Sequence, residues 1–128
     1  MKTIDVCLSP ELMHLYDVRD RTVVVADVLR ATSCMVTAFA HGAKSITPYS
    51  DLKECEAARS KGFITSGERD GKKVDGFDKG NSPFEYMGSD IQGKKIAFTT
   101  TNGTEAIHKG KGAKKLVIGS FLNLSSVV

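Results

Sequence analysis

The sequence predicts an α/β fold with three layers, α/β/α, around a largely parallel or mixed sheet. Short β-branched runs recur along the chain, helix-forming stretches fill several of the gaps, and glycine follows the helical stretches. Strands that alternate with helices indicate a largely parallel sheet, and a continuous apolar run such as residues 23–26 is typical of a strand buried on both faces. A length of 128 residues with 41% hydrophobic content suits a single domain.

The individual elements follow from local patterns. Strands are predicted at residues 3–8, 22–26, 44–47, 63–65, 95–99 and 115–118. Helices are predicted at residues 31–40, which end before Gly42, at residues 51–61, which begin at a capping aspartate and end before Gly62, and from residue 102 or 103 to 109. Residues 119–128 resemble a strand exit, a cap and the first apolar turn of another helix. Because one turn is not stable alone, we expect the chain to be the N-terminal portion of a longer protein.

Composition excludes several classes of protein. The net charge of +3 is too small to predict nucleic-acid binding, and no stretch approaches the roughly 18 apolar residues that cross a membrane. The start of the chain lacks the apolar run of a signal peptide, so a cytoplasmic location is expected. The three cysteines include no CxxC pair, which favours packed, reduced thiols over disulfides or a zinc site.

Two parts of the chain look alike. Residues 23–32 and residues 96–104 each read as a strand followed by a polar corner, and each leads through a helix to Gly-Ala-Lys and another strand. An internal duplication giving two related halves explains this pattern, and so does the general use of glycine to end helices. In either case both polar corners lie beyond the carboxyl ends of strands, where open α/β sheets bind ligands.

The second corner, FTTTNGT at residues 98–104, places hydroxyl groups and backbone amides at the start of a helix. The positive end of the helix dipole and a glycine that allows close approach suit a phosphate or sulfonate group. Capping of the helix explains any single threonine or asparagine equally well. The candidate substrate-binding residues here are Thr100, Thr101, Asn102, Gly103 and Thr104.

The first corner carries Asp27 at the end of a strand and Arg30 three residues later. A carboxylate in this position suits a hard cation such as magnesium, while a guanidinium grips an anion. A structural Asp–Arg pair, or an aspartate cap, fits the same residues equally well.

The longest irregular segment is predicted at residues 66–90. Its aromatic residues Phe77, Phe84 and Tyr86 predict an ordered loop rather than disorder, and long ordered loops are often functional. The loop offers acidic, basic and hydrogen-bonding side chains for a polar site, namely Glu68, Arg69, Asp78, Asn81 and Ser82. Turn residues that bond to their own backbone are the alternative interpretation of Asp78, Asn81 and Ser82.

Taken together, five blocks resemble the 2-phosphosulfolactate phosphatase family. The blocks are DVLRAT at residues 27–32, GER at 67–69, GFD with GNSP at 76–83, TTTNGT at 99–104 and GSFLN at 119–123. The resemblance implies an enzyme that uses Mg²⁺ to hydrolyse 2-phosphosulfolactate to sulfolactate on the route to coenzyme M. Its substrate carries phosphate, carboxylate and sulfonate groups, so the site must offset several negative charges.

The resemblance also implies roles for individual residues. Arg30, Arg69 and the second corner would bind the anion, and Asp27 and Asp78 would be the metal ligands. Glu68 would be a third ligand or the base that activates water, whereas a covalent aspartyl-phosphate on Asp27 is the competing route. Asn81 and Ser82 complete the predicted substrate-binding set.

Other functions remain open at this point. One is a phosphatase for another small 2-phospho acid, and another is a non-enzymatic or inactive anion-binding domain. A nucleotide-binding module is disfavoured, because neither GxGxxG nor GxxxxGK[ST] follows any predicted strand. The expected partner is a small anionic phosphorylated substrate, with no nucleic acid and no membrane, and a homo-oligomer stays open.

Overall fold

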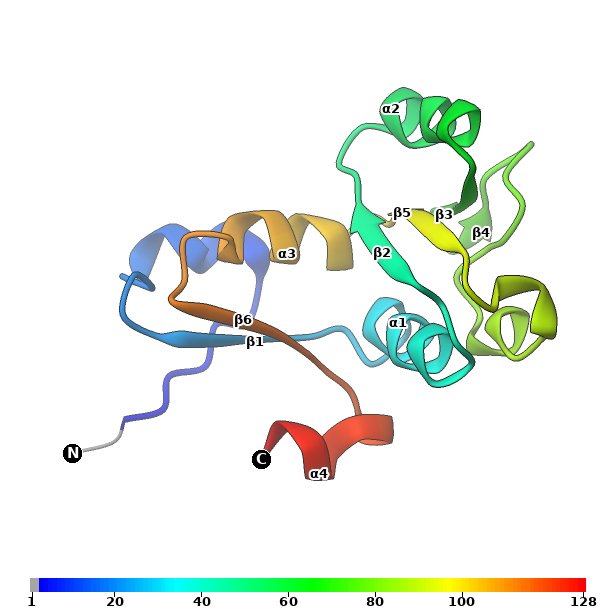
Figure 1. Cartoon of the computed structure of the whole chain (residues 1–128). Coiled ribbons are helices and arrows are strands. Elements are labelled where there is room, and N and C mark those ends of the chain that lie inside the picture. Colours follow the sequence, from blue (N-terminus) through cyan, green and yellow to red (C-terminus); the bar gives the residue numbers. More distant parts are fainter. Residues whose placement is uncertain (1–2) are drawn as a thin grey trace.

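A computed structural model describes residues 3–128 (Figure 1). The six strands that it shows in these residues are β1 (Thr22–Ala26), β2 (Ser45–Pro48), β3 (Phe63–Arg69), β4 (Lys72–Lys73), β5 (Lys95–Thr99) and β6 (Lys115–Gly119). The α-helices are α1 (Ala31–Ala40), α2 (Leu52–Ala57), α3 (Gly103–Gly110) and α4 (Leu124–Val127). The 3-10 helices are η1 (Pro10–Leu15), η2 (Ala58–Lys61), η3 (Pro83–Tyr86), η4 (Ser89–Ile91) and η5 (Phe121–Asn123).

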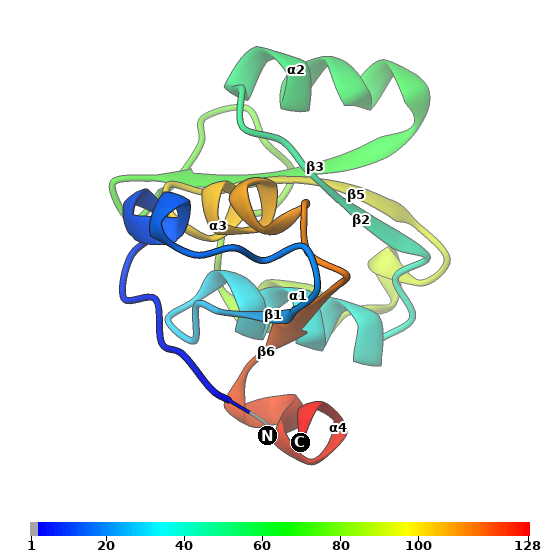
Figure 2. The ribbon, with the colours of Figure 1, turned by 90° about the vertical axis from the view of Figure 1, so that its left-hand side faces the viewer.

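The strands form two sheets rather than one. β1 and β6 make a parallel pair, and the other sheet has the order β2-β5-β3-β4, in which only β4 is antiparallel. Figure 2 shows α2 on one face of the four-stranded sheet, with α1 and α3 on the other. The predicted α/β class with layers of helix, mixed sheet and helix is therefore confirmed.

The two similar segments exchange strands between these sheets. The segment β1-α1-β2 starts in the two-stranded sheet and ends in the four-stranded one, whereas β5-α3-β6 runs the other way. The first strand of each segment therefore pairs in parallel with the last strand of the other. As a result, both polar corners lie at the starts of helices that cross between the sheets.

The core depends on alternation along β5. Ile96 and Phe98 pack in a cluster with α1, whereas Ala97 packs on the opposite face with Cys55 and Ala58 of α2 and η2. All three β5 side chains are fully buried, because helices cover both faces of this strand and neighbouring strands pair with both of its edges.

Two parts of the predicted structure need correction. Residues 3–8 form no strand, and the apolar side chains of Ile4, Val6 and Leu8 are exposed, because strand propensity alone does not supply a pairing partner. Residues 66–69 were predicted to be part of an irregular loop, but they continue β3, where they pair with β5 and β4. The rest of that segment is ordered as predicted, since Phe77 and Tyr86 are buried, but Phe84 is 83% exposed and is not an anchor of the loop.

The end of the chain confirms the predicted cap. The Ser120 hydroxyl accepts a hydrogen bond from Leu122 N, and Asn123 Oδ1 accepts one from Ser120 N, before α4 begins. Among residues 3–128, no helix combines the length and the apolar character that are needed to cross a membrane.

Candidate active site

The two polar corners meet at Asp27. This residue follows β1, and Gly103 opens α3, yet a Cβ atom at Gly103 would lie 2.9 Å from Asp27 Oδ2. The same atom would lie 2.5 Å from Cβ of Ala31, the first residue of α1. The N-termini of α1 and α3 are therefore in contact beside one carboxylate, and only glycine leaves room for this approach.

Local hydrogen bonds fix both corners. Asp27 N donates to Thr32 Oγ1 at 3.0 Å, and Thr32 N donates to Asp27 O at 3.0 Å. In the second corner Thr104 N donates to Thr100 Oγ1 at 3.2 Å, while Thr104 Oγ1 donates to Thr100 O at 2.7 Å. Thr32, Thr100 and Thr104 are buried, and their hydroxyl groups bond to the backbone of their own corners. They are not N-caps, because the N-cap residues of α1 and α3 are Arg30 and Asn102, and neither makes a side-chain cap hydrogen bond.

A polar pocket of about 270 Å³ opens next to Asp27. Six of the predicted site residues line it, namely Asp27, Arg30, Glu68, Asn81, Thr101 and Asn102. Three further residues, Leu29, Asp70 and Gly71, complete the lining and were not predicted. The pocket thus joins side chains from the first corner, the second corner and the segment that follows β3, which are far apart in the sequence.

Asp70 and Gly71 reach the pocket because they form the turn between β3 and β4. Arg69 pairs with Lys72, so the loop has two residues, and both have positive φ angles, 51° and 75°. This geometry is typical of a tight Asp-Gly hairpin turn. The Asp-Gly dipeptide was the available sequence signal, but its importance depended on recognising β4, which has only two residues.

Glu68 ties this hairpin to the second corner. Its Oε2 accepts a hydrogen bond from Gly71 N at 2.8 Å, and its Oε1 accepts one from Thr101 N at 2.8 Å. Arg30 adds a third link, since its Nη2 donates to Gly71 O at 3.3 Å. Both Glu68 oxygens therefore hold backbone in place, which suits a positioning residue better than a base.

The two central carboxylates differ in acidity. Burial raises the pKa of Asp27 above its ordinary value and the charge of Glu68 adds to the rise, although backbone hydrogen bonds from Ala31 and Arg30 oppose it. Burial also raises the pKa of Glu68, but the hydrogen bonds from Thr101 and Gly71 outweigh it, so the pKa of Glu68 is lowered. The environment therefore favours the neutral form of Asp27 and the ionised form of Glu68, relative to their ordinary values.

Asp78 does not line this pocket. Its Oδ2 accepts hydrogen bonds from Thr65 N and Thr65 Oγ1, both at 2.8 Å, and its Oδ1 lies 3.6 Å from Arg59 Nη2. Burial raises the pKa of Asp78, but the hydrogen bonds from Thr65 and the charge of Arg59 outweigh it and lower the pKa. This carboxylate joins β3 to the loop that follows it.

The other predicted residues outside the pocket lining also have structural contacts. Arg69 Nη1 donates to Glu68 O at 2.7 Å, and its Nη2 donates to Thr99 Oγ1 at 2.9 Å, so this side chain connects β3 to β5. Ser82 is the residue before η3. Gly103 is not in the lining, but it sits against Asp27 as described above.

The pocket chemistry fits a magnesium ion. Mg²⁺ prefers oxygen ligands and commonly uses one or two carboxylates together with water and substrate phosphate. Asp27 supplies a carboxylate, and the buried Asn81 Oδ1 has no hydrogen-bond partner among the described residues. No group of three or more His, Cys, Asp or Glu side chains suited to hold a metal occurs in residues 3–128, so the protein ligands of such an ion would be few.

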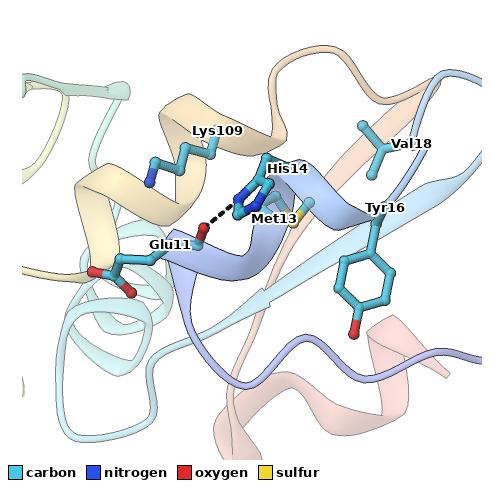
Figure 3. Close-up of a pocket in the computed structure, with 6 residues that line it drawn as sticks. All are labelled: Glu11, Met13, His14, Tyr16, Val18 and Lys109. Atoms are coloured by element: carbon cyan, nitrogen blue, oxygen red, sulfur yellow. Dashed lines mark hydrogen bonds between the residues drawn. The ribbon is translucent and has the colours of Figure 1, made fainter.

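A second hollow, of about 310 Å³, lies at η1 and shares no residue with this pocket. Figure 3 shows its lining: Glu11, Met13, His14, Tyr16, Val18 and Lys109. His14 Nδ1 lies 2.7 Å from Glu11 O, and Lys109 Nζ pairs with Glu105 at 2.9 Å. These polar groups bond within their own helices and do not converge on a common point.

Two of the three cysteines belong to the packed core as predicted, whereas Cys7 is partly exposed and lies in neither core cluster. Cys34 and Cys55 are fully buried, and all three cysteines are free thiols. Burial raises the pKa of Cys34 to about 12 and that of Cys55 to about 11, so neither is a ready nucleophile.

Comparison with known proteins agrees with the resemblance. The family model described as 2-phosphosulpholactate phosphatase matches residues 7–128. The chain belongs to this family. A probable 2-phosphosulfolactate phosphatase of Thermotoga petrophila is 45% identical over 125 residues, which cover 98% of this chain and 53% of that protein.

Two further relatives carry the same name. The protein of Carboxydothermus hydrogenoformans is 46% identical over 97% of this chain and 51% of its own length, and that of Clostridium tetani is 38% identical over 97% and 54%. The chain therefore spans about half the length of the curated relatives that it matches.

Proposed function

We propose that the protein is a magnesium-dependent phosphatase that hydrolyses 2-phosphosulfolactate to sulfolactate and inorganic phosphate. The observation that carries this proposal is the meeting of both polar corners at Asp27, beside Arg30 and next to the N-termini of two helices. The names of the relatives support the choice of substrate. The proposal includes action in the cytoplasm on the route to coenzyme M, and the state of assembly stays open.

The charges of the pocket favour an anion only when a cation is present. Asp27, Glu68 and Asp70 are acidic, and Arg30 is the one basic residue in the lining. A substrate with phosphate, carboxylate and sulfonate groups would be repelled by this excess of negative charge. Asp27 and oxygen atoms near it would hold Mg²⁺, which would supply positive charge to offset the negative charge of the phosphoryl group.

The residues of the pocket then have separate roles in binding and in the reaction. Arg30 contacts a phosphoryl or acidic oxygen, and the backbone amides at the start of α3 and the side chains of Thr101 and Asn102 orient the substrate. Asp27 either directs the attack of water on phosphorus or attacks phosphorus itself. In the second case the Asp27–phosphorus bond forms as the bond to the substrate oxygen breaks, and that oxygen takes a proton from water. A second water molecule later hydrolyses the acyl phosphate and restores the Asp27 carboxylate.

Phosphate release from 2-phosphosulfolactate tests the function. The natural full-length protein, freed of metal with EDTA and then supplied with Mg²⁺, should release phosphate only after the addition. If phosphate were released from other 2-phospho acids but not from 2-phosphosulfolactate, the proposed substrate would be wrong. No release from any of these esters, with the substrate bound, would favour the alternative of an inactive anion-binding domain.

A further inference from the structure

Two buried side-chain polar atoms have no hydrogen-bond partner among residues 3–128, His108 Nε2 and Asn81 Oδ1, and of these two residues only Asn81 lines the active-site pocket. Asn81 is 8% exposed. A buried carbonyl oxygen without a partner costs about 1–3 kcal/mol of stability. Such a cost at a pocket is explained if a ligand of the protein supplies the missing partner.

The backbone before Asn81 is held firmly. Lys79 N donates to Thr65 O at 3.0 Å, and Gly67 N donates to Lys79 O at 3.1 Å, which docks this segment along β3. Gly80 is held on both sides, because Gly80 O accepts from Tyr86 Oη at 2.5 Å and Gly80 N donates to Glu85 Oε2 at 2.8 Å. The backbone that leads to Asn81, a residue of the pocket lining, is therefore preorganised.

The charge around Asn81 indicates which kind of ligand would pair with its Oδ1. The pocket lining carries three carboxylates and one guanidinium, and both oxygens of Glu68 are already occupied by backbone amides. An unpartnered amide oxygen in this negative environment is a hard, neutral ligand for a divalent cation. Asp78, by contrast, lies outside the pocket lining, with its Oδ2 hydrogen-bonded to Thr65 and its Oδ1 3.6 Å from Arg59 Nη2.

We propose that Asn81 Oδ1 is a direct ligand of the divalent cation, together with the carboxylate of Asp27. The proposal deepens the proposed function and rests on it for the identity of the cation. It assigns the second protein ligand to a residue in the Gly-Asn-Ser-Pro block rather than to Asp78. In the alternative role the Asn81 amide donates to the substrate anion, and substitution of Asn81 would then leave metal binding unchanged in the absence of substrate.

Binding of Mn²⁺ to the natural full-length protein, without substrate, tests this role. The signal of free Mn²⁺ in electron paramagnetic resonance gives the dissociation constant directly. Asn81→Ala removes the oxygen and should weaken binding by about 10–100-fold, the loss that even outer contacts of a metal site commonly cause. Asn81→Asp keeps an oxygen in the same place and adds a charge, so it should bind Mn²⁺ at least as tightly as the unaltered protein.

Asn102→Asp is the matched control. Asn102 lines the same pocket but is exposed, so this substitution adds the same charge without replacing the buried oxygen. It should strengthen Mn²⁺ binding only slightly, because an exposed charge is screened by water and salt. Asp78→Asn should leave the dissociation constant unchanged.

Several results would overturn the assignment. It fails if Asn81→Ala binds Mn²⁺ as tightly as the unaltered protein, or if Asn81→Asp binds no better than Asn81→Ala while its thermal unfolding in EDTA is unchanged. If Asn81→Ala does not fold, the comparison of Asn81→Asp with Asn102→Asp decides. Because no substrate is present, loss of phosphate release with a normal Mn²⁺ response would count against the proposed function alone.

Discussion

Two strands of similar apolar sequence, β5 in the four-stranded sheet and β1 in the two-stranded sheet, differ in how far their side chains are buried. β5 has the sequence KIAFT, and its residues Ile96, Ala97 and Phe98 are completely buried. β1 has the more apolar and more β-branched sequence TVVVA, yet Val24 is 47% exposed. Sequence character therefore does not decide the burial of these strands.

The difference comes from what covers each strand. β5 lies between β2 and β3, with α1 on one face and α2 on the other. β1 pairs only with β6 in the described residues, and α3 covers the face that carries Val23, since a Cβ atom at Gly110 of α3 would lie 3.4 Å from Val23 Cγ1. Val24 points to the opposite face, which is open. The candidate active-site pocket lies where the two sheets meet, since Asp27 follows β1 and Glu68 belongs to β3.

The largest effect is expected at Asp27, the residue that follows β1. Asp27→Asn keeps the size of the side chain but removes the charge and the basic oxygen, so phosphate release should fall by at least about 100-fold. The steady-state rate of phosphate release from 2-phosphosulfolactate at saturating Mg²⁺ measures this fall. Asp78→Asn, which alters a carboxylate outside the pocket, is the control, and equal losses in both variants would contradict the role of Asp27.

Core substitutions compare the two sheets directly. Ile96→Ala should cost about 2–5 kcal/mol of unfolding free energy, because it leaves a cavity between α1 and the sheet. Val24→Ala should cost about 1 kcal/mol or less in this 128-residue chain, since much of the side chain is already in water. Urea denaturation of both variants measures the two values. Similar costs would mean that the open face of β1 is covered in solution.

Close contact between the two corners gives an intermediate effect. Gly103→Ala places a methyl group 2.5 Å from Ala31 Cβ and 2.9 Å from Asp27 Oδ2, so a helix or the carboxylate must move. We expect a loss of about 1–3 kcal/mol of stability together with weaker phosphate release. Gly112→Ala is the matched control, because no atom lies within 4 Å of its added Cβ, and its stability should change little. A Gly103→Ala variant with normal stability and turnover would show that the two corners are not in tight contact.

The sequence was sufficient for features that depend on neighbouring residues. α1 was predicted at its observed bounds, and both polar corners were placed at the ends of strands. It was not sufficient where distant pairing decides. Residues 66–69 are a strand because β5 and β4 lie beside them, and residues 3–8 are irregular although their local pattern is strand-like.

The same limit applies to the site. Asp27, Arg30 and Asn81 line one pocket as the motifs indicated, but Asp78 and Arg69 bond to the fold itself. In a sequence, a polar side chain that holds the backbone looks the same as one that binds a ligand. Only the count of hydrogen-bond partners separates them: Asp78 has its partners within the chain, and Asn81 Oδ1 has none in the part that the structure describes.

The smallest predicted effect is a difference in how stability responds to pH. The pKa of Asp78 is lowered by the contacts described above, so its stabilisation is present above its ordinary value of 3.8 and is lost as the pH falls through the lower folded value. The pKa of Asp27 is raised by burial, so its ionised form destabilises the fold at neutral pH, and this penalty disappears as the pH falls below 3.8.

The two asparagine variants should therefore shift stability in opposite directions. In EDTA at about pH 7, Asp27→Asn should unfold at a higher urea concentration than the unaltered protein, whereas Asp78→Asn should unfold at a lower one. The difference at Asp27 should shrink as the pH falls below the ordinary value of 3.8, and the difference at Asp78 should shrink as the pH falls further, through its lowered folded pKa. Because the active-site carboxylate opposes folding and the structural one supports it, a shift of the same sign in both variants would contradict this division between the pocket and its support.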